Sequence, residues 1–175
     1  MEPFGAPARH VSVENVAEEA QRAPSSPMSD ADLASLYRRQ RAPMIRLARL
    51  LTGSTATAEE VVQDAFLALH QRRARPDNPD GYLRTTVANM AKGRLRRIGL
   101  ERRAVRRDPV TFDDPHIDET WAALCRLPFR QRAVLALRFY EDLSEADIAR
   151  VLGCRLGTVK SSLHRALAKL REEMT

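Results

Sequence analysis

The sequence lacks the features of membrane-spanning, secreted and disulfide-stabilised proteins. No stretch approaches the roughly 18 uninterrupted apolar residues of a membrane span, and no basic segment leads into an apolar one near the N-terminus. Only two cysteines occur, Cys125 and Cys154, and their spacing suits neither a zinc site nor a disulfide framework. We therefore expect a cytoplasmic protein without membrane insertion, in which both cysteines are small core residues.

Signatures of enzymatic chemistry are also missing. No nucleophile motif or phosphate-binding loop occurs, and the acidic residues form no cluster of the kind that binds metals. The four histidines are scattered along the chain, at His10, His70, His116 and His164. The sequence therefore predicts no enzyme, no cofactor and no metal site.

Alternating strand patterns of useful length are absent, whereas helical periodicity covers most of the chain. A length of 175 residues, 43% of them hydrophobic and 30% charged, suits two small domains. We expect an all-α fold of two small helical domains joined by a flexible linker. The predicted boundaries are a disordered N-terminal tail over 1–29, a first domain over 30–98, the linker over 99–118 and a second domain over 119–175.

Start and stop signals place the individual helices. The first begins near Ser29 and ends at Thr52-Gly53, with Pro43 expected to split or kink it. Thr57-Ala58-Glu59-Glu60 reads as a capping box that opens a second helix, and a third begins at Pro79 or Asp80. Four helical patterns follow in the second domain: 119–126, 128–140, 144–152 and about 155–173.

The positive charge is concentrated in one segment. Residues 82–107 hold nine Lys and Arg against one acid, which gives +8 when the whole chain has a net charge of +6. Residues 108–118 then hold four aspartates and no base. Such a local excess favours binding of a polyanion at one place on the molecule.

The C-terminal part has the pattern of a helix-turn-helix. After a second capping box at Ser144, the small residues Ala149 and Gly153 suit a close helix crossing and a tight turn. Val159 and Leu163 would bury the inner face of the last helix. Its outward positions, which in a recognition helix meet bases and phosphates in a major groove, are Thr158, Lys160, Ser161, His164 and Arg165.

This motif alone leaves other interpretations open. An ordinary helical hairpin with a solvated charged face has the same pattern. A stand-alone transcription regulator that binds duplex DNA by itself is the principal functional alternative, although it would need a dimerising or ligand-sensing domain, and no pocket signature is visible.

Two longer runs together resemble a known family. LPFRQRAVLALRFYEDLSEADIARVLGCRLGTVKSSLHRALAKLRE, from Leu127 to Glu172, resembles region 4 of the extracytoplasmic-function (ECF, group 4) RNA polymerase sigma factors of the sigma-70 family. The stretch from about Asp32 to Arg97, with AEEVVQDAFLALHQR and GYLRTTVANMAKGRLRR, resembles their region 2. Both runs stand in the order and spacing of the family.

The resemblance implies a sigma factor that directs promoter-specific transcription initiation. Its region 2 domain would bind core RNA polymerase and recognise and melt the minus-10 element, and its region 4 domain would recognise the minus-35 element. The implied partners are core polymerase through its β′ clamp helices and β subunit, promoter DNA, and an anti-sigma factor. The positions that match the polymerase-binding pattern are Glu60, Gln63, Asp64 and Phe66, although Phe66 is equally suited to the core and the acids to a solvated face.

The resemblance also assigns DNA-binding residues. The minus-35 set is the outward face of the last helix described above. The minus-10 set comprises Asn78, Tyr82, Arg84, Asn89, Arg94, Arg96 and Arg97. Three positions depart from the family pattern: Tyr82 stands where Trp is usual, Gly93 where Asp is common, and Ser162 where an Arg would offer a phosphate contact.

Overall fold

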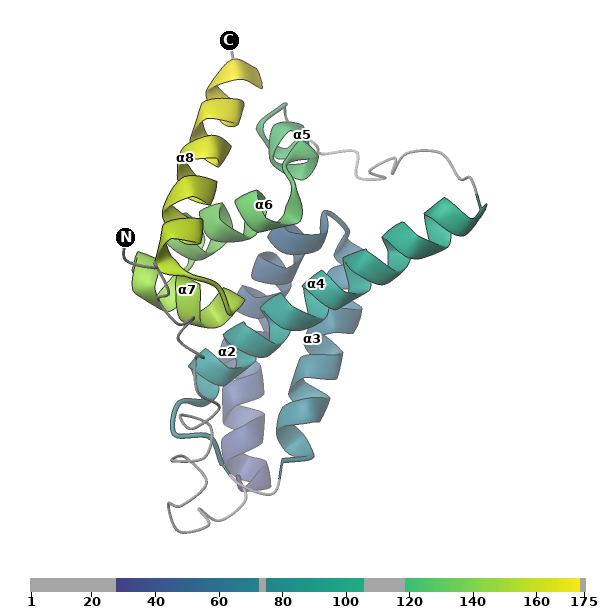
Figure 1. The fold of residues 1–175 in the computed structure, drawn as a ribbon. Helices are drawn as coiled ribbons and strands as arrows, with labels where there is room; N and C mark the ends of the chain where they lie inside the picture. Colours follow the sequence, from purple (N-terminus) through teal and green to yellow (C-terminus); the bar gives the residue numbers. More distant parts are fainter. Residues whose placement is uncertain (1–27, 73–74, 106–118, 174–175) are drawn as a thin grey trace, which may run out of the picture.

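The computed structural model describes residues 28–72, 75–105 and 119–173, and the regular structure within these ranges is entirely helical. The all-α prediction is therefore confirmed. Three long helices come first: α2 (Asp30–Thr52), α3 (Thr55–His70) and α4 (Pro79–Val105). They are followed by α5 (Glu119–Arg126), α6 (Phe129–Leu135), the π-helical segment η2 (Ala136–Tyr140), α7 (Glu145–Leu152) and α8 (Leu156–Glu173) (Figure 1).

The first three helices pack against one another and form the first helical group. Helix α2 begins at the cap Ser29, whose hydroxyl accepts the Asp32 N–H at 3.1 Å, and ends at Gly53 in the left-handed conformation. Pro43 lies inside this helix without dividing it into two elements. The buried face of the group includes Leu47, which has no exposed surface.

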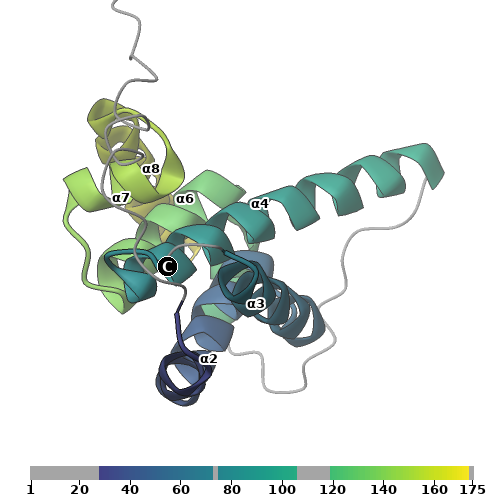
Figure 2. The same ribbon diagram turned by 90° about the horizontal axis from the view of Figure 1, so that it is seen from below.

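Two helix boundaries differ from the sequence prediction. Helix α3 begins at Thr55 because the hydroxyl of Ser54 accepts the Thr57 N–H at 3.3 Å, so Ser54 is the cap and the box predicted at Thr57 lies inside the helix. Helix α4 continues to Val105, beyond the predicted start of the linker at 99. Its C-terminal end projects past the other helices (Figures 1 and 2). The rest of the predicted linker, 106–118, and the predicted tail up to residue 27 lie outside the described residues.

The second helical group, α5 to α8, contains the predicted helix-turn-helix. The single helix expected over 128–140 consists of α6 and then η2, where the Glu141 N–H bonds back five residues to the Ala136 carbonyl at 3.2 Å. Helix α7 is capped by Ser144, as predicted. It ends at Gly153 with φ +59°, a conformation that favours glycine.

The two helical groups share one hydrophobic core cluster, in which Leu47 of α2 and Val87 of α4 belong with Val134, Ile148 and Val159 of the second group. Buried Arg132 of α6 reinforces this junction. Its guanidinium donates to the Leu51 carbonyl at 2.6 and 3.1 Å and to the Cys125 carbonyl at 2.8 Å. Because Leu51 is in the last turn of α2, the cation satisfies a carbonyl that has no partner within its own helix and complements the helix dipole.

Burial has opposite effects on two groups at this junction. It lowers the pKa of the Arg132 guanidinium and raises the pKa of the Cys125 thiol, because both charged forms lose hydration. Cys125 is buried and Cys154 is half-buried against the core cluster, in agreement with the prediction that both are core residues. Across the described ranges, no helix has the length and apolar character needed to cross a membrane.

Candidate nucleic-acid interface

Helix α8 presents the outward face predicted for a recognition helix. Val159 is fully buried and Leu163 packs on the core, so the opposite side of the helix faces solvent. Lys160, His164 and Arg165 are exposed. Thr158 and Ser161 are tied together, since the Ser161 hydroxyl donates to the Thr158 carbonyl at 3.2 Å, and Thr158 itself is half-buried. The exposed part of this face therefore carries two cationic side chains, one imidazole and one hydroxyl.

Ser162 proves to be a packing position. Its side chain is only 7% exposed, between the buried Val159 and Ala166 along the helix. The family resemblance suggested that Ser162 replaces an arginine that would contact a phosphate. This suggestion is wrong for this fold, because position 162 faces the inside of the second helical group. A long arginine would not reach DNA from there without displacing core side chains.

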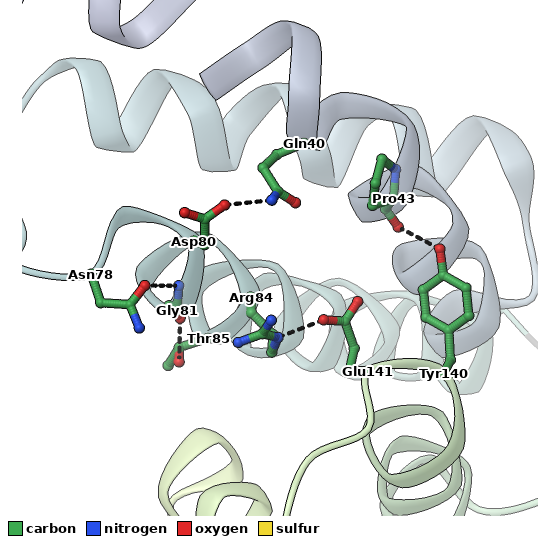
Figure 3. Close-up of polar contacts among 9 residues, drawn as sticks. All are labelled: Gln40, Pro43, Asn78, Asp80, Gly81, Arg84, Thr85, Tyr140 and Glu141. Carbon is green, nitrogen blue, oxygen red and sulfur yellow. Dashed lines mark hydrogen bonds and ion pairs between the residues drawn. The ribbon is translucent and has the colours of Figure 1, made fainter. Parts of the chain in front are cut away.

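The start of α4 is organised by a polar network around Asn78 and Asp80 (Figure 3). The side-chain oxygen of Asn78 accepts the Gly81 N–H at 2.9 Å, and the backbone carbonyl of Asn78 accepts the Tyr82 N–H. Asn78 therefore caps the helix. A Cβ on Gly81 would lie 2.8 Å from the Asn78 side-chain nitrogen, so a larger residue at position 81 would displace the Asn78 amide. Asp80 accepts hydrogen bonds from Arg39 and Gln40 of α2, which fixes the helix start against its neighbour.

Further along α4, two candidate DNA-binding residues already have intramolecular partners. Tyr82 is half-buried, and the guanidinium of Arg72 stacks over its ring at 4.7 Å from the centroid. Arg84 forms an ion pair with Glu141, the residue that follows η2, at 2.6 Å. The structure therefore connects one member of the minus-10 set to the second helical group.

The remaining members of the minus-10 set are on the surface of α4. Asn89, Arg96 and Arg97 are exposed. Arg94 forms an ion pair with Glu60 of α3, so a candidate DNA-binding residue and a candidate polymerase-binding residue are in contact. Gly93 is exposed, and a Cβ added at this position would have no atom within 4 Å.

Helix α3 exposes a stripe of side chains suited to a protein partner. Glu60, Gln63 and Asp64 are all exposed, as the sequence predicted. Leu67 continues the same stripe one turn later and is 51% exposed. The sequence analysis did not include Leu67 in the polymerase-binding set, although its spacing of three to four residues from Gln63 and Asp64 was the available signal.

Phe66 differs from the other residues matched to the polymerase-binding pattern. Its side chain is 6% exposed and contacts the Tyr37 ring edge-on, with ring centroids 4.9 Å apart. Phe66 is therefore a core residue of the first helical group, which was one of the two alternatives that the sequence left open for it. In the described ranges, no three His, Cys, Asp or Glu side chains come together in a group that could hold a metal ion.

Comparison with known proteins agrees with this arrangement. The family model for sigma-70 region 2 matches residues 36–100, and the model for sigma-70 region 4 matches residues 117–170. The chain is 36% identical over 143 residues to the ECF RNA polymerase sigma factor SigM of Mycobacterium tuberculosis, covering 77% of this chain and 73% of the relative. It is 34% identical over 140 residues to the RNA polymerase sigma-E factor of Streptomyces coelicolor, covering 75% and 79% respectively.

A solved structure shows the same fold. The sigma factor RpoE in complex with the anti-sigma factor NepR from Bartonella quintana superimposes with a TM-score of 0.67 at 23% identity, covering 82% of this chain and 96% of that chain.

Region 2 followed by region 4 in an all-helical chain defines a sigma factor of the sigma-70 family. The chain belongs to the ECF group of that family. It binds core RNA polymerase and directs promoter-specific transcription initiation, and the stand-alone regulator is not favoured because that alternative leaves region 2 unexplained. Proteins of this family are specificity subunits rather than enzymes.

Proposed function

We propose that residues 30–98 act as the region 2 domain, that 99–118 connect the domains, and that 119–175 act as the region 4 domain. Within region 2, the stripe of Glu60, Gln63 and Asp64 would contact the β′ clamp helices of core polymerase, with Leu67 adding apolar contact. Acids and an amide beside one exposed leucine suit a basic partner helix that also has apolar residues. The β subunit would be contacted elsewhere on the protein.

Promoter contacts are divided between two helices in this proposal. Helix α4 and its start would bind the melted minus-10 strand, with Asn78 and Asn89 contacting base edges, Tyr82 offering a ring face, and four arginines contacting phosphates: Arg84, Arg94, Arg96 and Arg97. Helix α8 would enter the major groove of the minus-35 element through Thr158, Lys160, Ser161, His164 and Arg165. The observation that carries this proposal is the exposed, cationic outer face of α8 on a correctly formed helix-turn-helix.

The assignment as a sigma factor also suggests where the protein acts and which protein regulates it. We propose that the protein works in the cytoplasm, where it meets polymerase and DNA, and that it has no active site of its own. An anti-sigma factor is a proposed partner, because RpoE of Bartonella quintana is in complex with one.

Run-off transcription with purified core polymerase tests the function. Specific transcripts from promoter fragments are expected only when both the protein and core polymerase are present. Sequence-specific duplex binding by the protein alone, without any transcript, would instead identify a stand-alone regulator.

The role of α8 is tested by Lys160→Ala and Arg165→Ala. Each is expected to weaken binding to the minus-35 element by about 1 to 3 kcal/mol if it contacts a base, and to reduce the salt dependence if it contacts a phosphate. Footprinting of the holoenzyme measures the first effect, and affinity for core polymerase is the control. A loss of core affinity instead would show that this face of α8 binds protein.

A further inference from the structure

The segment that leads into α4 is held against α2 by side-chain bonds from two of its residues. Arg75 forms an ion pair with Asp32 at 3.2 Å. Asp80, in the first turn of α4, accepts hydrogen bonds from Arg39, at 3.3 Å to each carboxylate oxygen, and from Gln40. We call the contacts of Asp80 with Arg39 and Gln40 the Asp80 bridge.

We propose that the Asp80 bridge positions Asn78 for base recognition in the minus-10 element. Arg39 and Gln40 are then positioning residues, which act on DNA only through the first turn of α4. This inference rests on the proposed assignment of Asn78 to a base edge. It adds that the choice of base at one minus-10 position depends on two side chains of α2 that lie outside the minus-10 set.

The bridge and the proposed base contact are joined by a single helical turn. Asn78 is exposed, and its side-chain oxygen accepts the Gly81 N–H at 2.9 Å. Gly81 directly follows Asp80, and its carbonyl accepts the Thr85 hydroxyl at 3.0 Å. Asp80 points toward Gln40 of α2, whereas the Asn78 side chain points toward Gly81 (Figure 3). A movement of Asp80 would therefore move the N–H that orients the Asn78 amide.

Apolar packing is weak in this segment. None of the residues from 75 to 82 is buried, and the first fully buried side chain of α4 is Leu83. A cleft of about 100 Å³ lies between the segment and α2, and its lining includes Arg75 and Pro79 on one side and Ser35 and Leu36 on the other. The position of the helix start therefore depends on the polar bonds beside this cleft.

The bridge is better suited to orienting a group than to stabilising the whole fold. The side chain of Arg39 is 56% exposed and that of Asp80 is 36% exposed, and ion pairs this exposed contribute little to the free energy of unfolding. Base recognition is sensitive to orientation, because a hydrogen bond weakens steeply as its length and angle depart from the ideal. Loss of the bridge is therefore expected to change base preference without unfolding the domain.

The test measures base preference at every minus-10 position. Holoenzyme formed from core polymerase and each variant is incubated with promoter fragments whose minus-10 non-template strand is randomised, and the bound fragments are sequenced. Asp80→Ala removes the acceptor of the bridge, and Gln40→Leu removes its half-buried donor. Each is expected to reduce the preference at one position by about fivefold, the contribution of one neutral hydrogen bond, and to leave the other positions unchanged.

Asn78→Ser identifies the position concerned. Because Asn78→Ser removes the amide and keeps a helix cap, it should reduce the preference at that same position. Combined with Asp80→Ala, it should cause no further loss there, because the bridge acts through the amide that is already missing. A structural defect of the first helical group would instead lower the binding of all fragments equally and add to the effect of Asn78→Ser.

Asp80→Asn and Arg38→Leu are the matched controls. Asp80→Asn keeps an oxygen that can accept from Gln40, so it should retain most of the preference that Asp80→Ala loses. Arg38 is exposed one position before Arg39 and forms no hydrogen bond to α4 within the described ranges. Arg38→Leu and Arg39→Leu remove the same charge, and only Arg39→Leu should lower the preference.

Several results would overturn the proposal. Unchanged preference in Asp80→Ala and Gln40→Leu would show that the bridge has no influence on base recognition. A loss at a position other than the one changed by Asn78→Ser, or equally at all positions, would show that the bridge acts on the fold in general. Full preference in Asn78→Ser would show that Asn78 contacts no base. If the wild-type holoenzyme enriches no sequence at all, the proposed function itself is contradicted, and this inference with it; run-off transcription identifies that case separately.

Discussion

Asn78 combines a structural and a proposed functional role in one side chain. Its oxygen accepts the Gly81 N–H and so stabilises the start of α4, whereas the amide nitrogen belongs to the same rigid group and is oriented by that bond. A base-reading amide held by a helix cap would have a defined direction before DNA arrives. The sequence suggested only the base contact, because the cap depends on where the helix begins.

Replacing Asn78 by serine separates these two roles. A serine hydroxyl caps a helix about as well as an asparagine oxygen, so Asn78→Ser is expected to keep the free energy of unfolding within about 0.5 kcal/mol of wild type. It removes the amide, so minus-10 recognition by the holoenzyme should weaken by about 1 kcal/mol, the size of one neutral hydrogen bond. Urea denaturation and promoter binding measure the two effects.

Asn78→Ala provides the comparison, because it removes both the cap and the amide and should lose about 1 kcal/mol of stability as well. If Asn78→Ser initiates transcription as efficiently as wild type, Asn78 has only its capping role.

At the scale of single elements, the cap of α7 links hydrogen bonding to ionisation. Asp147 is in the first turn, where its N–H donates to the Ser144 hydroxyl at 3.2 Å while its carboxylate accepts from that same hydroxyl. This side-chain hydrogen bond is the main reason that the pKa of Asp147 lies below its ordinary value, and Arg150 adds a smaller effect in the same direction.

Ser144→Ala should therefore change both stability and its pH dependence. The lost cap is expected to lower the free energy of unfolding by about 1 kcal/mol near neutral pH. In wild type, the stabilising effect of ionised Asp147 is present above its unfolded pKa and is lost as the pH falls through its lowered folded pKa. In the variant, the pKa of Asp147 should move up toward the ordinary value, which a carboxyl NMR titration measures. An unchanged pKa would show that the hydrogen bond to Ser144 is not the cause.

The helices show which kinds of information the sequence contains. Caps and turns made by neighbouring residues were predicted correctly at Ser144 and Gly153, because those signals are local. The cap of α3 was misplaced by three residues, since Ser54 and Thr57 are both good caps and only the fold selects between them. The π-helical turn of η2 has no comparable local signal in the sequence, and the residues at its end, Tyr140 and Glu141, contact distant helices.

For the whole molecule, the main feature that the sequence did not predict is the junction between the two helical groups. Each group could be recognised from its own periodicity, whereas contacts such as Arg132 with the Leu51 carbonyl join residues 81 positions apart. The exposure of candidate residues such as Lys160 and Arg165 could be predicted from helix facing, whereas the choice between core and surface for Phe66 was left open by the sequence. Burial of that kind depends on which elements pack together.

The shared core predicts that the two groups stabilise each other. Leu47→Ala in α2 should lower the free energy of unfolding by about 2 to 5 kcal/mol, because this side chain is fully buried. When α2 unfolds, Arg132 loses its Leu51 acceptor and the second group loses part of its apolar cover. Hydrogen exchange measured by mass spectrometry is therefore expected to accelerate in α8 as well as in α3.

Leu67→Ala is the control for this effect, because Leu67 is half exposed on α3 and its truncation should leave the exchange of both helices nearly unchanged. Faster exchange confined to α2, α3 and α4 in Leu47→Ala would show that the second group is stable by itself. Faster exchange in α8 would show instead that the junction contributes free energy to region 4. A cycle of wild type, Leu47→Ala, Glu141→Gln and the double variant measures how much of this coupling depends on the ion pair between Arg84 and Glu141.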